Sequence, residues 1–234
     1  MKQNLVFVIP AYNEEESIVQ TLKDVKRQFP KNDIFVVNDG SKDRTKEFAE
    51  AQGVHVLTHV INRGLGAALS TGIQAAIRSN VDIVVTFDAD LQHLGKDVER
   101  LIKPIQNNKA DAVIGSRFMS KKDVELMPRI KRFGNTLLTG VTNILSDTTI
   151  TDSQSGLRAF NREAAEKLII LCDKYEVSSE IIHQLGHHNL RILEIPIKAI
   201  YDDRSVQRGT NQMPFKNGLR IVWSMLLRTI GVKR

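Results

Sequence analysis

The chain has 234 residues, 41% of them hydrophobic and 26% charged, which suits one large α/β domain or a domain with a small appendage and excludes a disordered or integral membrane protein. Its only cysteine, Cys172, excludes an internal disulfide, and the apolar run near the amino terminus is too short for a signal peptide, so we expect a cytoplasmic protein. The net charge of +6 favours an anionic partner such as anionic lipid or a phosphorylated ligand, although a solvated basic face would have the same charge.

The first part of the chain alternates short apolar runs with segments of helical spacing. Pro10 cannot donate to a sheet ladder, so we expect it to close the first strand and to leave Tyr12 and Glu14 at the carboxyl edge of the sheet. A second acidic loop, which contains Asp39, follows the second strand at the same edge. The patterns predict strands at residues 4–9, 34–37 and 54–58 and helices at residues 15–29 and 45–52.

A glycine-containing turn, Gly64-Leu65-Gly66, leads into a helix predicted to end near Ser79. This turn follows the third strand rather than the first and lacks a third glycine, which disfavours a dinucleotide-binding fingerprint. We expect the glycines to allow a close backbone approach at the helix start.

The run Ile83 to Phe87 is typical of a buried parallel strand, and Asp88, Asp90 and Gln92 follow it directly. Ligands of open α/β sheets bind outside the carboxyl ends of the strands, and oxygen ligands suit a divalent cation and the phosphates it neutralises. The alternative is that these residues are turn formers that cap the next helix.

A helix at residues 95–107 and a strand at 111–115 complete five strands separated by helices. This alternation predicts an α/β fold with a parallel sheet covered on both faces. The residues then predict a nucleotide-sized cleft at the carboxyl edge, lined by Tyr12, Glu14, Asp39, Asp88 and Asp90.

The second half of the chain is more basic and more amphipathic. Residues 121–146 place basic side chains ahead of an apolar stretch that is too short to span a bilayer, as in a docked or membrane-apposed helix. From Arg204 to Arg234 there are seven basic residues and no acidic one. The patterns further predict a polar loop that enters a strand at residues 151–160, helices at 161–171, 177–188 and 214–230, and an edge strand at 190–200.

Five motifs occur in the order typical of family 2 glycosyltransferases, and the chain most resembles their polyprenyl-phosphate branch, the dolichol-phosphate mannose synthase-like enzymes. The resemblance covers Leu5 to about Gln212, and five strings in order are more specific than any one of them. The motifs are Pro10-Ala11-Tyr12-Asn13-Glu14-Glu15, Val37-Asn38-Asp39-Gly40-Ser41-x-Asp43-x-Thr45, Asp88-Ala89-Asp90-Leu91-Gln92-His93, Gly115-Ser116-Arg117 and Thr151-Asp152-x-x-Ser155-Gly156-x-Arg158.

The resemblance implies a GT-A fold: a Rossmann-like, mostly parallel sheet with helices on both faces, followed here by C-terminal amphipathic helices. It also implies a metal-dependent hexosyltransferase that inverts the sugar as it moves it from a nucleotide diphosphate sugar. The expected product is a lipid-linked monosaccharide for cell-envelope glycans or glycosylation. The expected domains are a catalytic domain at residues 1–212 and a basic amphipathic helix at 213–234.

The resemblance also assigns residues to roles. Asp88, Asp90 and Arg117 would be catalytic, and Asp90 with Gln92 would hold Mg²⁺ or Mn²⁺ on the diphosphate, where a cation offsets the charge of the leaving group. The nucleotide sugar would be bound by Pro10, Ala11, Tyr12, Glu14, Asp39, Asp88, Ala89, Arg204 and Arg208.

A phosphate acceptor is also favoured by the basic residues of the second half of the chain. A sugar hydroxyl needs a positioned base, whereas a lipid phosphate already carries about −1.5 to −2 charge at neutral pH and needs cations instead. Guanidinium groups suit bidentate phosphate contacts. We therefore expect Arg117, Lys131 and Arg132 to bind the acceptor phosphate.

Two departures from the family pattern affect the carboxyl-terminal part. The family ends its catalytic domain with Arg and then Gly-x-Ser-Lys, whereas this chain has Arg204 and then Gly209-Thr210-Asn211-Gln212, so Arg208 would replace the lysine. Relatives commonly continue into transmembrane helices after this point. Either this sequence is part of a longer chain or a separate small membrane protein supplies the anchor. We expect a peripheral protein on the cytoplasmic face of the membrane and no nucleic acid partner.

Other interpretations remain open at this point. A family 2 enzyme acting on a polysaccharide hydroxyl would use Glu180 or Asp152 as base, but the Gln-x-x-Arg-Trp string of processive synthases is absent. A non-catalytic nucleotide-binding domain would not require Asp88, Asp90, Gln92 and Arg117 together. His183 and His187 have a spacing that could suit zinc, yet no acidic ligand is placed near them in sequence.

Overall fold

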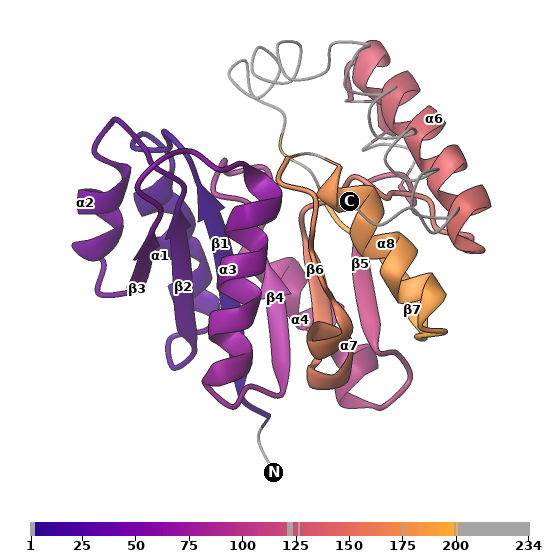
Figure 1. Ribbon diagram of the computed structural model, residues 1–234, viewed down its shortest axis with the longest axis horizontal. Coiled ribbons are helices and arrows are strands. Elements are labelled where there is room, and N and C mark those ends of the chain that lie inside the picture. The colour runs from indigo at the N-terminus through magenta and orange to yellow at the C-terminus, as the bar shows by residue number, and fades with distance from the viewer. Residues whose placement is uncertain (1–2, 121–123, 126, 175, 199, 201–234) are drawn as a thin grey trace.

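A computed structural model describes residues 3–120, 124–125, 127–174, 176–198 and 200. In these residues seven strands form one sheet, which lies between two layers of helices (Figure 1). The strand order is β3-β2-β1-β4-β6-β5-β7. All neighbouring strands pair in parallel except β6, which runs antiparallel to both β4 and β5. The strands are β1 (Leu5–Ala11), β2 (Asp33–Asn38), β3 (His55–Thr58), β4 (Ile83–Thr86), β5 (Ala112–Ser116), β6 (Arg158–Asn161) and β7 (Ile192–Pro196).

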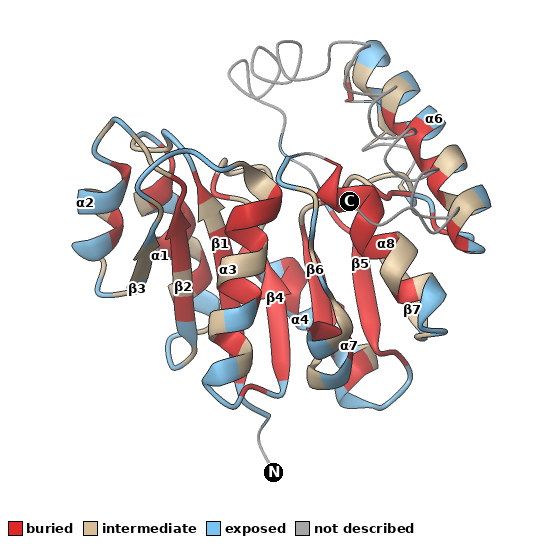
Figure 2. Cartoon of the chain, viewed as in Figure 1, coloured by how far each residue is buried: buried red, intermediate tan, exposed pale blue. Residues whose placement is uncertain are grey.

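Alternating side chains of β1 face two separate apolar clusters, one on each side of the sheet. Phe7 and Ile9 pack with α1 (Ile18–Gln28), α2 (Thr45–Glu50) and α4 (Gly95–Gln106). Val6 and Val8 pack on the opposite side with α3 (Leu65–Arg78), α7 (Arg162–Lys167) and α8 (Val177–His187). Figure 2 shows the central strands buried almost throughout. The predicted mostly parallel sheet with helices on both faces is therefore confirmed.

Helix α6 (Arg129–Ser146) lies outside these two layers and packs against α8 (Figure 1). The hydroxyl of Thr142 donates to the hydroxyl of Ser179 at 2.9 Å. The side of α6 away from α8 exposes several large apolar side chains, so the predicted amphipathic helix in residues 121–146 is confirmed for its described part.

The expectation that Pro10 closes the first strand was wrong, because β1 continues through Pro10 and Ala11 and pairs with β2. The carbonyl of Val8 points toward β4 and accepts from Phe87, so the nitrogen of Pro10, two residues later, faces the same side. Pairing with β4 ends at Val8. The missing N–H of Pro10 therefore removes no ladder bond.

The helix predicted at residues 161–171 is shorter than expected, since α7 ends at Lys167. Residues 168–174, which we call the strap, run along α8 without helical structure. The side chain of Gln184 on α8 accepts from the amide of Ile169 at 2.7 Å and donates to its carbonyl at 2.6 Å. These bonds compete with helix formation, so local periodicity overestimated the helix.

The remaining expected elements differ from the structure by only a few residues at their ends. Strand β7 lies at one edge of the sheet and contains Pro196, as predicted. No helix in the described part of the chain is long and apolar enough to span a bilayer. The helix expected at 214–230 and the domain boundary after residue 212 lie outside the described residues.

Candidate functional site

The carboxyl ends of four parallel strands, β2, β1, β4 and β5, lie at one edge of the sheet and carry most of the residues singled out from the sequence. Tyr12 follows β1, Asp39 follows β2, Asp88 closely follows β4 and Arg117 follows β5. Because β6 runs in the opposite direction, its first residue, Arg158, also lies at this edge, opposite Thr86. The sequence therefore placed these side chains at the correct edge, but not the arginine that the antiparallel strand adds.

Asp90 and Gln92 face each other across a strained turn. Leu91 between them has a φ of 65°, a left-handed conformation that is unfavourable for a leucine. The amide of Gln92 donates to Asp90 Oδ1 at 3.1 Å, and its side-chain amide donates to Oδ2. Burial and the neighbouring charge of Asp88 raise the pKa of Asp90 to about 6. Asp88 and Asp90 therefore place two negative charges close together, and a bound cation would offset their repulsion.

Asp88 contacts His93 and lies close to the backbone of Gly156. The ring Nε2 of His93, a buried side chain, lies 3.0 Å from Asp88 Oδ2. A Cβ atom on Gly156 would lie only 2.1 Å from the same oxygen, so only glycine allows this approach. Burial favours a higher pKa for Asp88, but the bond to His93 and the charges of Arg158 and Arg117 hold its pKa below the ordinary value.

Arg158 is a buried cation, 1% exposed, whose charge acts on both Asp88 and Asp152. Its Nη2 donates to the carbonyl of Ser153 at 3.2 Å. Burial lowers the pKa of Arg158 to about 10, and the charges of the two aspartates oppose that shift. A buried charge of this kind is tolerated only with compensating partners, so Arg158 and the two aspartates form one electrostatic unit.

Arg117 is fixed by a fully buried carboxylate. Its Nε and Nη2 donate to the two oxygens of Asp152 at 2.7 and 2.9 Å, and its backbone amide donates to Oδ2 at 3.1 Å. Glu194 of β7 in turn accepts from the amides of Thr151 and Asp152 at 2.7 and 3.0 Å. Asp152, which Glu194 holds in place, therefore fixes the guanidinium of Arg117 in one orientation.

Lys131 on α6 belongs to the same cluster of charges. Burial, followed by the positive charge of Arg117, lowers the pKa of Lys131, and the negative charge of Asp90 opposes that shift. Arg117 and Lys131 therefore lie within electrostatic range of each other and of the acidic loop after β4. Arg132 is exposed and points about 100° around the helix from Lys131, because successive helical side chains rotate by that angle.

The residues expected to hold the nucleoside lie at the other half of this edge. Tyr12 is 42% exposed, whereas Ala11 is buried and its carbonyl accepts from the amide of Asp39 at 2.9 Å. Glu14 accepts from the hydroxyl of Ser17 and, through its carbonyl, from the first amides of α1. Pro10 is half-buried in β1, and Ala89 is buried with its carbonyl bonded to Thr21 at 3.0 Å.

Asp39 is buried and accepts three hydrogen bonds from the segment after β3. Its Oδ1 lies 2.7 Å from His59 Nδ1 and accepts from the amide of Arg63 at 2.9 Å, and its Oδ2 accepts from the amide of Gly64 at 2.7 Å. The other ring nitrogen of His59 lies 3.0 Å from the hydroxyl of Thr71. Asp39 thus fixes the start of α3 beside the expected nucleoside site.

The glycine turn at the start of α3 serves close packing, as the sequence predicted. A Cβ on Gly66 would lie 1.7 Å from the carbonyl oxygen of Cys172, and one on Gly64 would lie 2.3 Å from that of Asp173. The first amides of α3 are bonded to Asp173 rather than exposed to a ligand. This geometry agrees with the rejection of a dinucleotide fingerprint.

Arg204 and Arg208 lie outside the described residues. The chain that leads toward them passes the acidic loop, because the amide of Ile200 donates to the carbonyl of Gln92 at 3.1 Å.

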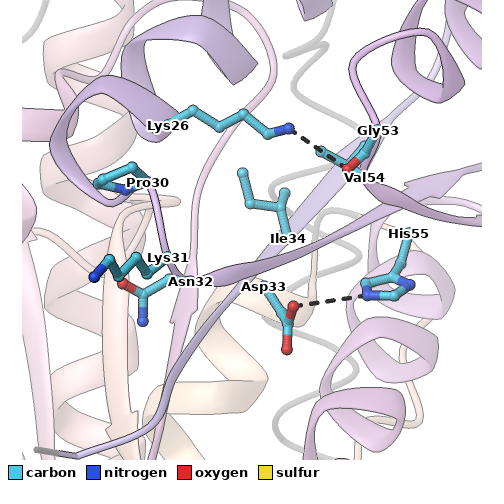
Figure 3. Close-up of a pocket in the computed structure, with 9 residues that line it drawn as sticks. All are labelled: Lys26, Pro30, Lys31, Asn32, Asp33, Ile34, Gly53, Val54 and His55. Carbon is cyan, nitrogen blue, oxygen red and sulfur yellow. Dashed lines mark hydrogen bonds and ion pairs between the residues drawn. The ribbon is translucent and has the colours of Figure 1, made fainter.

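A hollow on the opposite edge of the sheet is unrelated to this site (Figure 3). The first residues of β2 and β3, Asp33 and His55, line it, and Asp33 Oδ1 lies 3.7 Å from His55 Nε2. The side chain of Lys26 is turned toward the carbonyl of Gly53 (Figure 3). The hollow lies at the amino ends of the strands, whereas Asp88 and Asp90 lie at the carboxyl end of β4.

Two alternative assignments fit the geometry poorly. Asp152 is bonded to Arg117 and Glu180 is buried against backbone amides, so neither is placed to abstract a proton from a sugar. In the described part of the chain, no three His, Cys, Asp or Glu side chains gather as a metal site. The rings of His183 and His187 lie 6.3 Å apart and approximately stacked, which is not an arrangement around a shared zinc ion.

The structure adds four residues that sequence reasoning did not assign to the site: His93, Gly156, Arg158 and Glu194. Three of them belong to motifs already noted, since His93 ends the acidic string and Gly156 and Arg158 end the string that begins at Thr151. Their presence in those strings was a usable signal. Glu194 had no signal, because its role depends on β7 pairing beside β5.

Comparison with known proteins gives a consistent result. A family model described as Glycosyl transferase family 2 matches residues 6–169. An uncharacterized protein of Methanocaldococcus jannaschii is 46% identical, over 98% of this chain and 93% of its own length. A UDP-N-acetylglucosamine–dolichyl-phosphate N-acetylglucosaminyltransferase of Methanococcus voltae is 37% identical, over 99% of this chain and 98% of its own length.

A solved structure confirms the fold. Glucosyl-3-phosphoglycerate synthase of Mycobacterium tuberculosis, in complex with Mn²⁺, uridine diphosphate and phosphoglyceric acid, superposes with a TM-score of 0.72 at 20% identity. The match covers 99% of this chain and 80% of the synthase. The expected GT-A fold is therefore confirmed.

Proposed function

The chain belongs to glycosyl transferase family 2, and from that membership we propose that it transfers a sugar from a nucleotide diphosphate sugar to a polyprenyl phosphate. The product is a lipid-linked monosaccharide. The observation that carries the proposal is the gathering of opposite charges at one sheet edge, where Asp88 and Asp90 lie within electrostatic range of Arg117 and Lys131. The relative from Methanococcus voltae, whose name specifies dolichyl phosphate as its acceptor, supports it.

On the donor side, the nucleoside lies against Tyr12 and the loops that carry Glu14 and Asp39. The exposed ring of Tyr12 offers a surface for the base. These two loops are bonded to each other, since the amide of Glu14 donates to the hydroxyl of Thr45 at 2.7 Å. Arg204 and Arg208 complete the donor site from the carboxyl-terminal segment.

Asp90 and Gln92 suit a bound Mg²⁺ or Mn²⁺. Their oxygens match the hard ligands that these ions prefer. Burial and the charge of Asp88 raise the pKa of Asp90, so a bound cation would stabilise its ionised form. Mg²⁺ sites commonly use only one or two carboxylates together with substrate phosphates, which agrees with the small number of protein ligands. The cation would neutralise the diphosphate that leaves. The solved neighbour bound to Mn²⁺ and uridine diphosphate supports this part of the proposal.

On the acceptor side, Arg117 and Lys131 bind the lipid phosphate and orient it. One phosphate oxygen forms the new bond to the anomeric carbon, and the bond from that carbon to the diphosphate oxygen breaks. The nucleoside diphosphate departs with the electron pair, so the anomeric configuration inverts. The phosphate attacks as an anion, and no protein base is required. Arg132 meets the lipid headgroup further out on α6.

The exposed face of α6 supports attachment of the enzyme to a membrane surface. Ile130, Phe133, Leu137 and Ile144 lie on this face, and Phe133 and Ile144 are 72% and 83% exposed. Arg129 and Arg132 are exposed beside them. A helix with an apolar face flanked by cations lies in the interface of anionic lipid. We propose peripheral attachment at the cytoplasmic face, where a separate membrane protein could add an anchor.

A panel of donors with three acceptors tests the proposed function. Radiolabelled UDP-, GDP- and dTDP-sugars are incubated with Mg²⁺ and a polyprenyl phosphate, a soluble glycan or phosphoglyceric acid. The proposal predicts label in the organic phase with one donor and the lipid acceptor. Label only in the glycan or in phosphoglyceric acid would favour a hydroxyl acceptor, and nucleotide binding without any transfer would favour a non-catalytic domain.

A further inference from the structure

Glu180 has a defined task in the structure, although it does not reach the reacting groups. It lies in the first turn of α8 and is 2% exposed. Its two carboxylate oxygens accept from the backbone amides of Leu171 and Cys172 at 3.0 and 2.9 Å. By accepting hydrogen bonds from these two amides, Glu180 fixes the strap to α8.

The strap in turn closes on the start of α3. The carbonyl of Asp173 accepts from the amides of Gly66 and Ala67 at 2.8 and 3.4 Å. The approach is so close that no side chain fits at Gly64 or Gly66, where a Cβ would collide with strap carbonyls. The amino end of α3 is therefore held on one side by residues that Glu180 positions.

The same helix start is held on its other side by Asp39. The amides of Arg63 and Gly64 donate to Asp39 at 2.9 and 2.7 Å, and His59 adds a contact of 2.7 Å. A shift of the helix start would therefore move Asp39 or break its bonds. The strap and Asp39 therefore both hold the backbone at residues 63–67 by hydrogen bonds to its amides.

We propose that Glu180 is a positioning residue for the nucleotide donor, which acts through the strap and the start of α3 on Asp39. This inference rests on the proposed function only in that the Asp39 end of the sheet edge binds the nucleoside. It assigns a positioning role in donor binding to a residue of α8. It also replaces the assignment of Glu180 as a general base, which would require contact with the acceptor hydroxyl.

Glu180→Gln tests the inference with a small change of shape. The amide keeps one acceptor oxygen but presents an NH₂ group to the second backbone amide, which leaves that buried amide unpaired. We expect the donor KM to rise about tenfold, as for one lost buried hydrogen bond, while kcat changes by less than about threefold. Loss of a general base would instead lower kcat by roughly 100-fold or more at unchanged donor KM and would overturn the inference.

Two further variants separate positioning from general loss of stability. Gly66→Ala pushes on the same contact from the α3 side and should raise the donor KM similarly, and the double variant should show less than the product of the two effects. Asn161→Ala removes a helix cap at the opposite edge, where Asn161 accepts from the amide of Ala164 at 2.7 Å. It should lower the melting temperature without changing the donor KM. An equal rise of KM in Asn161→Ala would overturn the inference.

Nucleotide binding tests the inference independently of turnover. UDP, GDP and dTDP are titrated with Mg²⁺ into folded wild-type protein by calorimetry, and the tightest one is then titrated into Glu180→Gln. We expect Kd to rise about tenfold. An unchanged Kd would overturn the role of Glu180, whereas no binding of any nucleotide to wild-type protein would contradict the proposed function itself.

Discussion

Asp152 holds Arg117 by two side-chain hydrogen bonds of 2.7 and 2.9 Å, and this aspartate is itself fully buried. A second arginine–aspartate pair, Arg191 with Asp111, has almost the same bidentate geometry, with distances of 3.0 and 2.7 Å, at the opposite edge of the sheet. Mutating each pair in turn therefore separates the loss of stability caused by removing such an ion pair from the loss of activity caused by removing it at the site.

Asp152→Asn should weaken acceptor binding. The asparagine removes the negative charge that orients Arg117, so we expect the KM for polyprenyl phosphate to rise about tenfold or more while Kd for the nucleoside diphosphate changes little. Steady-state kinetics with each substrate varied in turn measure both. A rise confined to the donor would show that Arg117 serves the nucleotide instead.

Asp111→Asn is the matched control and should affect stability only. The hydrogen bonds of Arg191 lower the pKa of Asp111 to about 2, below its ordinary value of 3.8. The stabilisation is therefore present above pH 4 and is lost as the pH falls toward 2. Thermal melts should show a lower melting temperature for the variant at pH 7 and a shrinking difference at acidic pH, with kcat unchanged throughout. A large loss of kcat would mean that the two sheet edges are coupled.

Asp90→Asn should abolish transfer without unfolding the protein. Losing the carboxylate removes the favoured cation ligand, and we expect kcat to fall about 100-fold or more. Because the pKa of Asp90 is raised to about 6, its ionised form destabilises the metal-free fold above pH 6. Without metal, the variant should melt at or above the wild-type temperature at pH 8, and the two should converge below pH 4. A lower melting temperature at pH 8, or wild-type activity with a chelator present, would contradict the account.

Gly156→Ala should displace Asp88. The added methyl group would lie 2.1 Å from Asp88 Oδ2, so the carboxylate would have to move away from its present position. We expect kcat/KM to fall about 100-fold with a stability loss of about 1–3 kcal/mol. Gly140→Ala is the control, because nothing lies within 4 Å of its Cβ position and alanine favours a helix. Full activity of Gly156→Ala would contradict a fixed position for Asp88.

Phe133→Gln should weaken membrane binding. It removes one large ring from the apolar face of α6 without changing the net charge, whereas Thr136→Gln changes an exposed polar neighbour on the same helix. Sedimentation with anionic vesicles should show severalfold less bound protein for Phe133→Gln than for the control. Equal sedimentation of both would remove α6 from the membrane contact.

Much of the fold was predictable because the relevant signals are local. Apolar runs such as Ile83 to Phe87 end abruptly in polar residues, and their alternation with helical segments requires a parallel sheet. The positions of Tyr12, Asp39, Asp88 and Arg117 at one edge follow directly from that topology.

The parts that could not be predicted depend on contacts between distant segments. Nothing in the four residues of β6 indicates that it inserts antiparallel between β4 and β5, yet this places Arg158 beside Asp88. The strap has helical spacing, and only the side chains of α8 make it extended. Pro10 is tolerated in β1 because the pairing of β1 with β4 ends at Val8, so no strand bond is required from the nitrogen of Pro10.

The most direct measurement of the central claim compares a polyprenyl phosphate with the same polyprenol lacking phosphate, at equal concentration in vesicles, using the donor found in the panel. The account predicts that labelled sugar enters the organic phase only with the phosphate, and that Asp152→Asn reduces this labelling more than Asp111→Asn does. Equal labelling of the polyprenol would show a hydroxyl acceptor and would contradict the role of Arg117 and Lys131 as the cations that bind the acceptor phosphate.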